Sequence, residues 1–148
     1  MQGIKALTFD TGGTILDWHT GISGALAEAG GRRGLERDWP AIANDYRAAS
    51  LKAMVNTGAD APATFNIDDV HRQQLAEMIE KHDLGAFTES DRQAIWYRWH
   101  DLDCWPDFPA ALGRMRQKYI VASFTILTVS MIVDTAKRNG LSWDAVIS

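Results

Sequence analysis

A short apolar segment that ends in an aspartate and two glycines constrains the fold of this chain most. Residues 4–9 are mainly apolar, and Asp10-Thr11-Gly12-Gly13-Thr14 follows them directly. An apolar run of this length predicts a buried strand, and the paired glycines predict a tight turn behind it. Open α/β sheets bind ligands at the carboxyl ends of their strands, so Asp10 lies where such a sheet would place a functional group.

The next part of the sequence, residues 16–104, has the periodicity of helices. Apolar residues recur at helical spacing in four stretches, and residues that start or stop helices separate them. These signals are Gly30-Gly31 at the end of the first helix, Asp38 before the second, Asn66 and Gly85 around the third, and Thr88 before the fourth. Residues 56–64 predict a loop. We therefore expect an inserted, all-helical module.

The last part of the sequence alternates between helices and strands. The expected elements are a short helix after Asp107, a buried strand over residues 119–124, a helix between Thr128 and Gly140, and a third strand over residues 145–147. Strands that alternate with helices favour a parallel sheet. The sequence thus predicts an α/β fold, in which residues 1–15 and 105–148 form a Rossmann-like core and residues 16–104 form a helical cap.

Composition and charge exclude several classes of protein. The 148 residues are 46% hydrophobic and 23% charged, which is typical of a globular domain. A net charge of −4 provides no broad basic surface for nucleic acid, and no apolar run is long enough for a membrane span or a signal peptide. A single cysteine, Cys104, excludes an internal disulfide and fits a reducing compartment. We therefore expect a cytoplasmic protein.

The turn around Asp10 carries the clearest chemistry. The small residues Thr11 and Gly12 leave backbone N–H groups to face an anion, and Thr14 adds a hydroxyl. This arrangement suits a carboxylate that attacks a substrate and forms a covalent ester. The alternative is that Asp10 only caps a turn, because polar residues are common in turns.

Three stretches of the sequence resemble the haloacid dehalogenase superfamily. Residues 9–18, from Phe9 to Trp18, resemble its first motif, and residues 99–107 and 137–144 resemble segments of its 2-haloacid dehalogenase branch. The resemblance implies that Asp10 attacks the carbon that bears the halogen and that water then hydrolyses the aspartyl ester. It implies a small halogenated carboxylic acid as the substrate and no metal or other cofactor.

The residue two positions after Asp10 separates the reactions of this superfamily. Its phosphatases carry a second aspartate there as general acid and base, because an alkoxide leaving group needs a proton. A halide leaves as a stable anion and needs none. This chain has Gly12 at that position, which favours dehalogenation. The dehalogenases usually have an aromatic residue there, so Gly12 also alters the expected wall of the substrate pocket.

The resemblance also implies a second group of site residues at the end of the second strand. Thr125 takes the position of the Ser or Thr hydroxyl of the second motif, and Ser123 is a lesser candidate on the same face of the strand. Ile126 follows where the dehalogenases usually have asparagine. Since an isoleucine side chain donates no hydrogen bond, Ile126 changes this part of the expected substrate site.

The substrate carboxylate would need a cation from the cap. Arg47 lies at about the position of the arginine that has this role in the family. A guanidinium can bind a carboxylate through two hydrogen bonds. The alternative is that Arg47 is a solvated arginine on the helix surface. Trp39, together with Trp18 and Trp99, would line an apolar pocket of halide size, although tryptophans at helical positions are more often core residues.

Two other groups of reactive side chains favour structural roles. His100, Asp101 and Asp103 include only one histidine, so we expect surface or capping roles for them and no metal site. Cys104 has few basic neighbours in the sequence, and we expect no nucleophilic role for it.

The family pattern continues with a lysine motif and an acidic motif, and neither can be placed before Ser148. We therefore expect a fragment, a shortened product, or a chain that borrows a strand from a partner, in which case a homodimer is the expected assembly. We expect weak or no dehalogenase activity from the 148-residue form. Halide release from 2-chloropropionate at the normal rate of the family would contradict this expectation.

Three other functions remain open. An actin-like ATPase or hydantoinase opening also uses an Asp-x-Gly-Gly-Thr turn, but it continues into a hairpin, whereas residues 18–29 predict a helix here. A metal-dependent phosphatase is disfavoured by Gly12. A non-catalytic binding or assembly module is favoured by the missing motifs and by Ile126, and a stable dimer in solution would support it.

Overall fold

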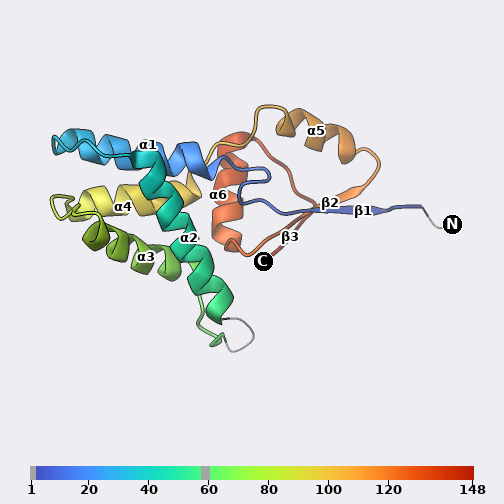
Figure 1. Cartoon of the computed structure of the whole chain (residues 1–148). Coiled ribbons are helices and arrows are strands. Elements are labelled where there is room, and N and C mark those ends of the chain that lie inside the picture. Colours follow the sequence, from blue (N-terminus) through green and yellow to red (C-terminus); the bar gives the residue numbers. More distant parts are fainter. Residues whose placement is uncertain (1–2, 58–60) are drawn as a thin grey trace. The chain divides into compact units, whose positions relative to one another are not determined.

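The chain, described by a computed structural model over residues 3–57 and 61–148, divides into two compact units. One unit, here called the core, contains residues 1–18 and 100–148, and the other, the cap, contains residues 19–99. Figure 1 follows both units along the chain. Within the described residues, we find no helix with the length and apolar character needed to cross a membrane.

The core contains a parallel sheet of three strands. The strands are β1 (Ala6–Phe9), β2 (Ile120–Phe124) and β3 (Ala145–Ile147), and β2 lies between the other two. Phe9 pairs with Ser123, and Ser123 pairs with Val146, so the three strands end at the same edge of the sheet. The predicted α/β fold with a parallel sheet is confirmed.

Helices cover one face of this sheet. Helix α5 (Phe108–Met115) precedes β2, and α6 (Val129–Asn139) connects β2 to β3. Right-handed crossovers between strands that are added in one direction place their helices on the same face. Thr128 caps α6 at its start, and Gly140, with a φ of 64°, ends it, as predicted.

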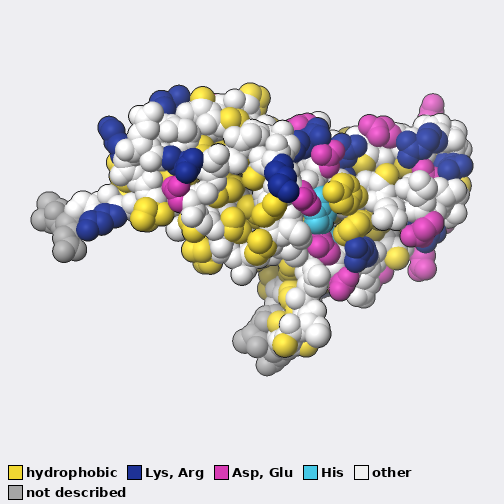
Figure 2. Space-filling model, turned by 180° about the vertical axis from the view of Figure 1, so that it is seen from behind, with side chains coloured by type: hydrophobic (Ala, Val, Ile, Leu, Met, Phe, Trp, Pro, Cys, Tyr) yellow, Lys and Arg dark blue, Asp and Glu magenta, His cyan; other side chains and the backbone are white. Residues whose placement is uncertain are grey.

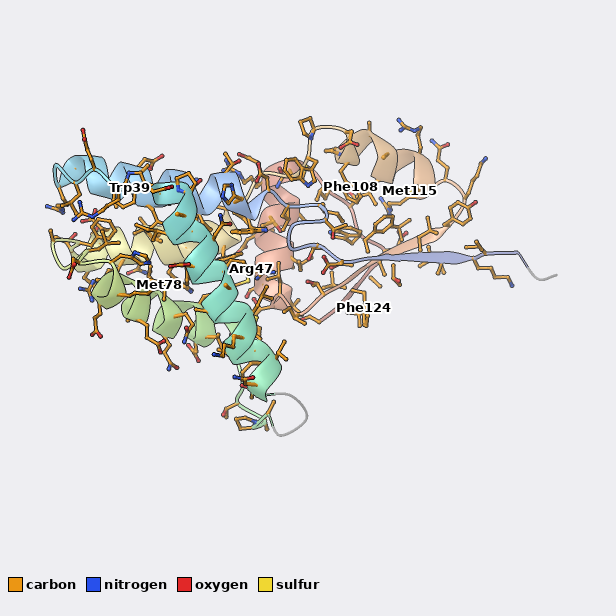
Figure 3. All side chains as sticks on the ribbon, viewed as in Figure 1. Trp39, Arg47, Met78, Phe108, Met115 and Phe124 are labelled. Atoms are coloured by element: carbon orange, nitrogen blue, oxygen red, sulfur yellow. The ribbon has the colours of Figure 1, made fainter. Side chains whose placement is uncertain are left out.

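The opposite face of the sheet is open in the described residues. Ile120 and Phe124 in β2 are 58% and 60% exposed, whereas Val121 and Ser123 between them are fully buried. Hydrophobic side chains are accordingly visible on the surface of the core in Figure 2, and Phe124 is labelled in Figure 3. The prediction of buried strands is therefore confirmed for one face and wrong for the other, because both connecting helices lie on one side.

The cap consists of helices, in the order that the sequence predicts. They are α1 (Trp18–Arg32), α2 (Trp39–Thr57), α3 (Ile67–Lys81) and α4 (Glu89–Tyr97), followed by a short 3₁₀-helix, η2 (Arg98–His100). Asp38 and Asn66 each accept a hydrogen bond from a backbone N–H of the helix that they precede, as expected of helix caps. Part of the predicted loop, residues 58–60, lies outside the described residues.

The paired glycines of α1 do not end the helix, which corrects the prediction made from the sequence. The helix continues to Arg32, and Gly34, with a φ of 66°, provides the left-handed residue that follows it. A Cβ atom on Gly30 would lie 2.1 Å from Cζ2 of the Trp39 ring. Gly30 is therefore glycine because the ring from α2 lies against the backbone of α1.

We expect opposite effects on stability from alanine at the two adjacent glycines. Gly30→Ala should lower the free energy of unfolding by about 1–3 kcal/mol, because the Trp39 ring must move. Gly31→Ala should raise it by up to about 1 kcal/mol, because no atom lies within 4 Å of a Cβ there and alanine favours helix. Urea denaturation of both variants measures the difference, and equal effects would contradict this explanation of Gly30.

The third helix also ends earlier than predicted. It stops at Lys81 rather than at Gly85, and Asp83, with a φ of 53°, takes the left-handed conformation that glycine usually takes. The N–H of Leu84 donates to the carbonyl of Ile79 over 2.9 Å, and the Leu84 side chain is fully buried. Burial of Leu84 thus fixes the end of α3, whereas the glycine after it is not needed.

Asp91 joins the start of α4 to the end of α1. Thr88 and Asp91 form the predicted capping box, and the Asp91 carboxylate also accepts hydrogen bonds from Arg32 over 2.8 Å and from Arg33 over 2.9 Å. Asp91 itself is only 2% exposed. The Arg32 guanidinium, assisted by Thr88, holds the pKa of this carboxyl well below its usual range.

Asp91→Asn should destabilise the cap in a pH-dependent way. Because the folded-state pKa is lowered, the ionised carboxylate stabilises the fold above the unfolded pKa of about 3.9, and this stabilisation is lost as the pH falls below it. We expect a lower Tm for the variant than for the parent at pH 7, and a gap that narrows below about pH 4. Asp69→Asn, which removes an exposed carboxylate paired with Arg72, is the control, and a gap independent of pH would contradict the expectation.

Candidate active site

Asp10 directly follows β1, and its side chain is exposed. Its Oδ2 accepts a hydrogen bond from the Thr14 hydroxyl over 2.7 Å. The turn between them closes through hydrogen bonds from the N–H groups of Ile15 and Leu16 to the carbonyl of Thr11, over 3.0 and 2.9 Å. The carboxylate is thus held through one of its two oxygens, Oδ2.

Position 13, the second glycine of this turn, requires glycine. Gly13 has a φ of 101°, in the left-handed region, and a Cβ there would lie 3.1 Å from Nε1 of Trp18. Gly12 is half-buried and pairs with Leu16. The Thr11 side chain is buried, and its hydroxyl has no hydrogen-bond partner within the described part of the chain. Any contact of Thr11 with a substrate would therefore come from its backbone.

Thr125 directly follows β2, as Asp10 follows β1. Because β1 and β2 are paired neighbours that end together, Thr125 lies at the same edge of the sheet as Asp10. The Thr125 N–H donates to the carbonyl of Ile147 over 3.0 Å, and its hydroxyl accepts from the N–H of Leu127 over 3.2 Å. This acceptor role leaves the hydroxyl proton to be donated elsewhere.

The two other candidates near the end of β2 differ in exposure. Ser123 is fully buried, and its hydroxyl has no hydrogen-bond partner among residues 3–57 and 61–148. Ile126 is 52% exposed at the edge of the sheet. Thr125 is therefore better placed than Ser123 to meet a ligand. Sequence reasoning did not single out Ser148, which follows β3 at this edge and donates to the carbonyl of Leu127 over 2.7 Å.

Arg47 belongs to the cap and lies on a buried aromatic cluster. It is half-buried in α2, where Figure 3 labels it, and its guanidinium carbon is 5.5 Å from the centre of the Trp99 ring. Trp99 donates to the Tyr46 hydroxyl over 3.2 Å, and Tyr46 donates to the carbonyl of His71 over 2.8 Å. The His71 ring stacks on Trp99 at 4.1 Å, so this support comes from three helices.

Sequence reasoning missed Tyr46 and His71 as members of this cluster. Both side chains are fully buried, and burial raises the pKa of the Tyr46 hydroxyl far above its usual range. Their signal in the sequence is weak, because Tyr46 occupies an ordinary apolar position of its helix. The predicted pocket residue Trp39 packs against Gly30 and stacks on Phe87, with ring centres 6.3 Å apart. A role for Trp39 in a substrate pocket stays a prediction.

The segment that returns from the cap to the core is tied to α6. Arg138 forms ion pairs with Asp101 over 2.7 Å and with Asp103 over 2.8 Å. His100 is buried, and its Nδ1 lies 2.8 Å from Asp134. The expected surface role of His100 is therefore wrong, because the ring is enclosed beside α6, whereas the two aspartates serve as ion-pair partners.

Two further observations concern metal and thiol chemistry. Within the described residues, no three side chains of histidine, cysteine, aspartate or glutamate come together as metal ligands would. Burial raises the pKa of the half-buried Cys104 thiol, which disfavours the reactive thiolate. The turn around Asp10 is thus the strongest candidate for the chemistry of this chain.

The chain is similar to several solved structures. No family model and no curated protein matches the chain. A defluorinating L-2-haloacid dehalogenase matches with a TM-score of 0.88 and 30% identity over 99% of this chain and 60% of its own. Another L-2-haloacid dehalogenase matches with a TM-score of 0.86 and 25% identity over 97% of this chain and 61% of its own.

A third similar structure has a ligand on the protein. It is the L-2-haloacid dehalogenase from Xanthobacter autotrophicus with chloropropionic acid covalently bound, with a TM-score of 0.80 and 21% identity over 99% of this chain and 57% of its own. At this identity the match supports the fold alone. The chain spans about 60% of the length of the first of these dehalogenases.

Proposed function

Because the chain belongs to the haloacid dehalogenase superfamily, we propose that it displaces halide from 2-haloalkanoic acids through an ester on Asp10. One observation carries this proposal. The Asp10 carboxylate stands at the tip of β1, held by the Thr14 hydroxyl at 2.7 Å, with Gly12 where a proton-donating acid would stand in a phosphatase.

The proposed reaction has two steps. In the first, Oδ1 of Asp10 attacks the carbon that bears the halogen, the carbon–halogen bond breaks, and halide leaves with the bonding electrons. In the second, water attacks the carbonyl carbon of the Asp10 ester, and the ester bond breaks. The products are the 2-hydroxy acid, the restored Asp10 carboxylate and a proton. Neither step requires a redox group, because the substrate carbon and the protein both keep their oxidation states.

Arg47 is proposed as the cation that binds the substrate carboxylate. Its guanidinium is supported by the Trp99 ring, which restricts its motion and leaves planar N–H groups for a bidentate contact. Trp39 is proposed to line the same pocket from the start of α2.

Thr125 is proposed to donate its hydroxyl proton to the substrate or to the Asp10 ester. Its place at the end of β2, next to the end of β1, supports this role. Backbone N–H groups of Thr11 and Gly12 are proposed to face the developing charge, as in other anion-binding turns. Ile126 would then provide an apolar contact for the substrate, because its side chain is exposed at this edge of the sheet.

The test is halide release and the mass of the protein. The chain is incubated with 2-chloropropionate, halide is measured by ion chromatography, and the peptide that contains Asp10 is examined by mass spectrometry. We expect at least one halide per chain and an ester on Asp10. The absence of both halide release and the Asp10 ester would contradict the proposal. Hydrolysis of p-nitrophenyl phosphate in the presence of magnesium would indicate a phosphatase instead.

A non-catalytic assembly module is the second candidate, and the open apolar face of the sheet favours it. Size-exclusion chromatography with light scattering distinguishes the two, because a stable dimer without any ester on Asp10 supports the module. We also propose a cytoplasmic location, which the single cysteine supports.

A further inference from the structure

A cavity between α3 and α4 in the cap has no role in the proposed reaction. The two helices lie side by side in Figure 1 and pack against each other. The cavity between them has a volume of about 420 Å³, within the range of small-molecule sites. Leu75, Ile79 and Trp96 line it and are largely buried, so they provide an apolar floor.

The rim of this cavity carries charged side chains. Two guanidinium groups, from Arg72 and Arg92, and one carboxylate, from Glu89, line it. The guanidinium carbon of Arg72 lies 3.8 Å from the centre of the Trp96 ring. Stacking on the ring orients the guanidinium and leaves its N–H edge for a carboxylate. Its pair with Asp69, at 3.1 Å, is exposed and contributes little, so a ligand can replace it.

Arg72 and Arg92 come from two neighbouring helices and line the same groove. The contact of Arg72 with Trp96 places the second turn of α3 beside the end of α4. Arg92 precedes Trp96 by one helical turn, and Ala76 follows Arg72 by one turn, so Arg92 and Ala76 face each other across the groove. The small side chain of Ala76 leaves the space between the two guanidinium groups open.

We propose that this cavity binds a small monoanion with a flat apolar body, such as an aromatic carboxylic acid. The carboxylate lies between Arg72 and Arg92, and the ring lies on the apolar floor beside Trp96. A dianion is disfavoured by Glu89, which lines the cavity one helical turn from Arg92. The inference concerns the cap alone and does not depend on the proposed dehalogenase activity.

The test is titration calorimetry of the whole chain with 2-naphthoate. We expect binding at least about tenfold tighter than that of 2-naphthylmethanol, which has the same rings without the charge. Arg72→Gln and Arg92→Gln should each weaken binding by roughly tenfold, because each removes a charge-assisted hydrogen bond. Ala76→Leu should abolish binding by filling the groove while every charge stays in place.

Two arginine variants serve as controls. Arg37→Gln changes an exposed arginine whose guanidinium donates to the carbonyl of the neighbouring Glu36, and it should bind like the parent. Arg47→Gln should also bind like the parent, because the probe is not expected to depend on the candidate active site. The proposal is overturned if the alcohol binds as tightly as 2-naphthoate, if Ala76→Leu binds normally, or if Arg47→Gln alone removes binding.

Discussion

Replacing Asp10 with asparagine is expected to end halide release from 2-chloropropionate, down to the level of a reaction without protein. The amide has nearly the same shape, so Thr14 can still donate to its oxygen, as it does to the carboxylate at 2.7 Å. It lacks the negative charge that makes the carboxylate a nucleophile, and the ester cannot form. Ion chromatography measures the halide, and mass spectrometry measures the ester on the peptide that contains residue 10.

Asp107→Asn is the matched control for this experiment. Asp107 also lies in the core and precedes a helix, but its side chain makes no capping hydrogen bond. It should retain the halide release of the parent. If Asp10→Asn releases halide as the parent does, a different group or a directly attacking water performs the displacement. If it releases none but the parent also forms no ester, the assembly module becomes the better explanation.

Local side-chain chemistry made most helix starts predictable from the sequence. Asn66, Thr88 and Thr128 each accept a hydrogen bond from a backbone N–H within the next three residues, and Gly140 supplies a left-handed end. Each of these interactions lies within one helical turn. The same holds for the candidate site, since the hydrogen bond from Thr14 to Asp10 spans only four residues.

Features that depend on distant residues were not predictable in this way. Gly30 looks like a helix stop until the Trp39 ring is seen against it, and Asp83 takes a left-handed conformation because Leu84 is buried. The apolar strands suggested burial on both faces, but the order of the connections decides which face is covered. Similarly, the sequence placed Arg47 on a helix but not on the ring of Trp99, which lies on another element.

Trp99→Ala is expected to lower the stability of the cap by about 3–5 kcal/mol, the largest structural effect that we anticipate. The ring is fully buried, it stacks on His71, and its N–H donates to the Tyr46 hydroxyl. Its removal leaves a cavity as well as a buried hydroxyl with one partner fewer. Urea denaturation followed by circular dichroism measures the loss, provided that the cap transition is resolved from that of the core.

Trp99→Phe and Tyr97→Ala separate the contributions to this effect. Phenylalanine keeps an aromatic ring beside His71 but loses the hydrogen bond to Tyr46, so we expect a loss of about 1–2 kcal/mol. Tyr97 is half exposed two residues earlier, and its replacement should cost less than about 1 kcal/mol. A Trp99→Ala variant as stable as Tyr97→Ala would mean that the cluster does not hold the cap together. Because the same ring supports Arg47, Trp99→Phe should retain more halide release than Trp99→Ala under conditions where both remain folded.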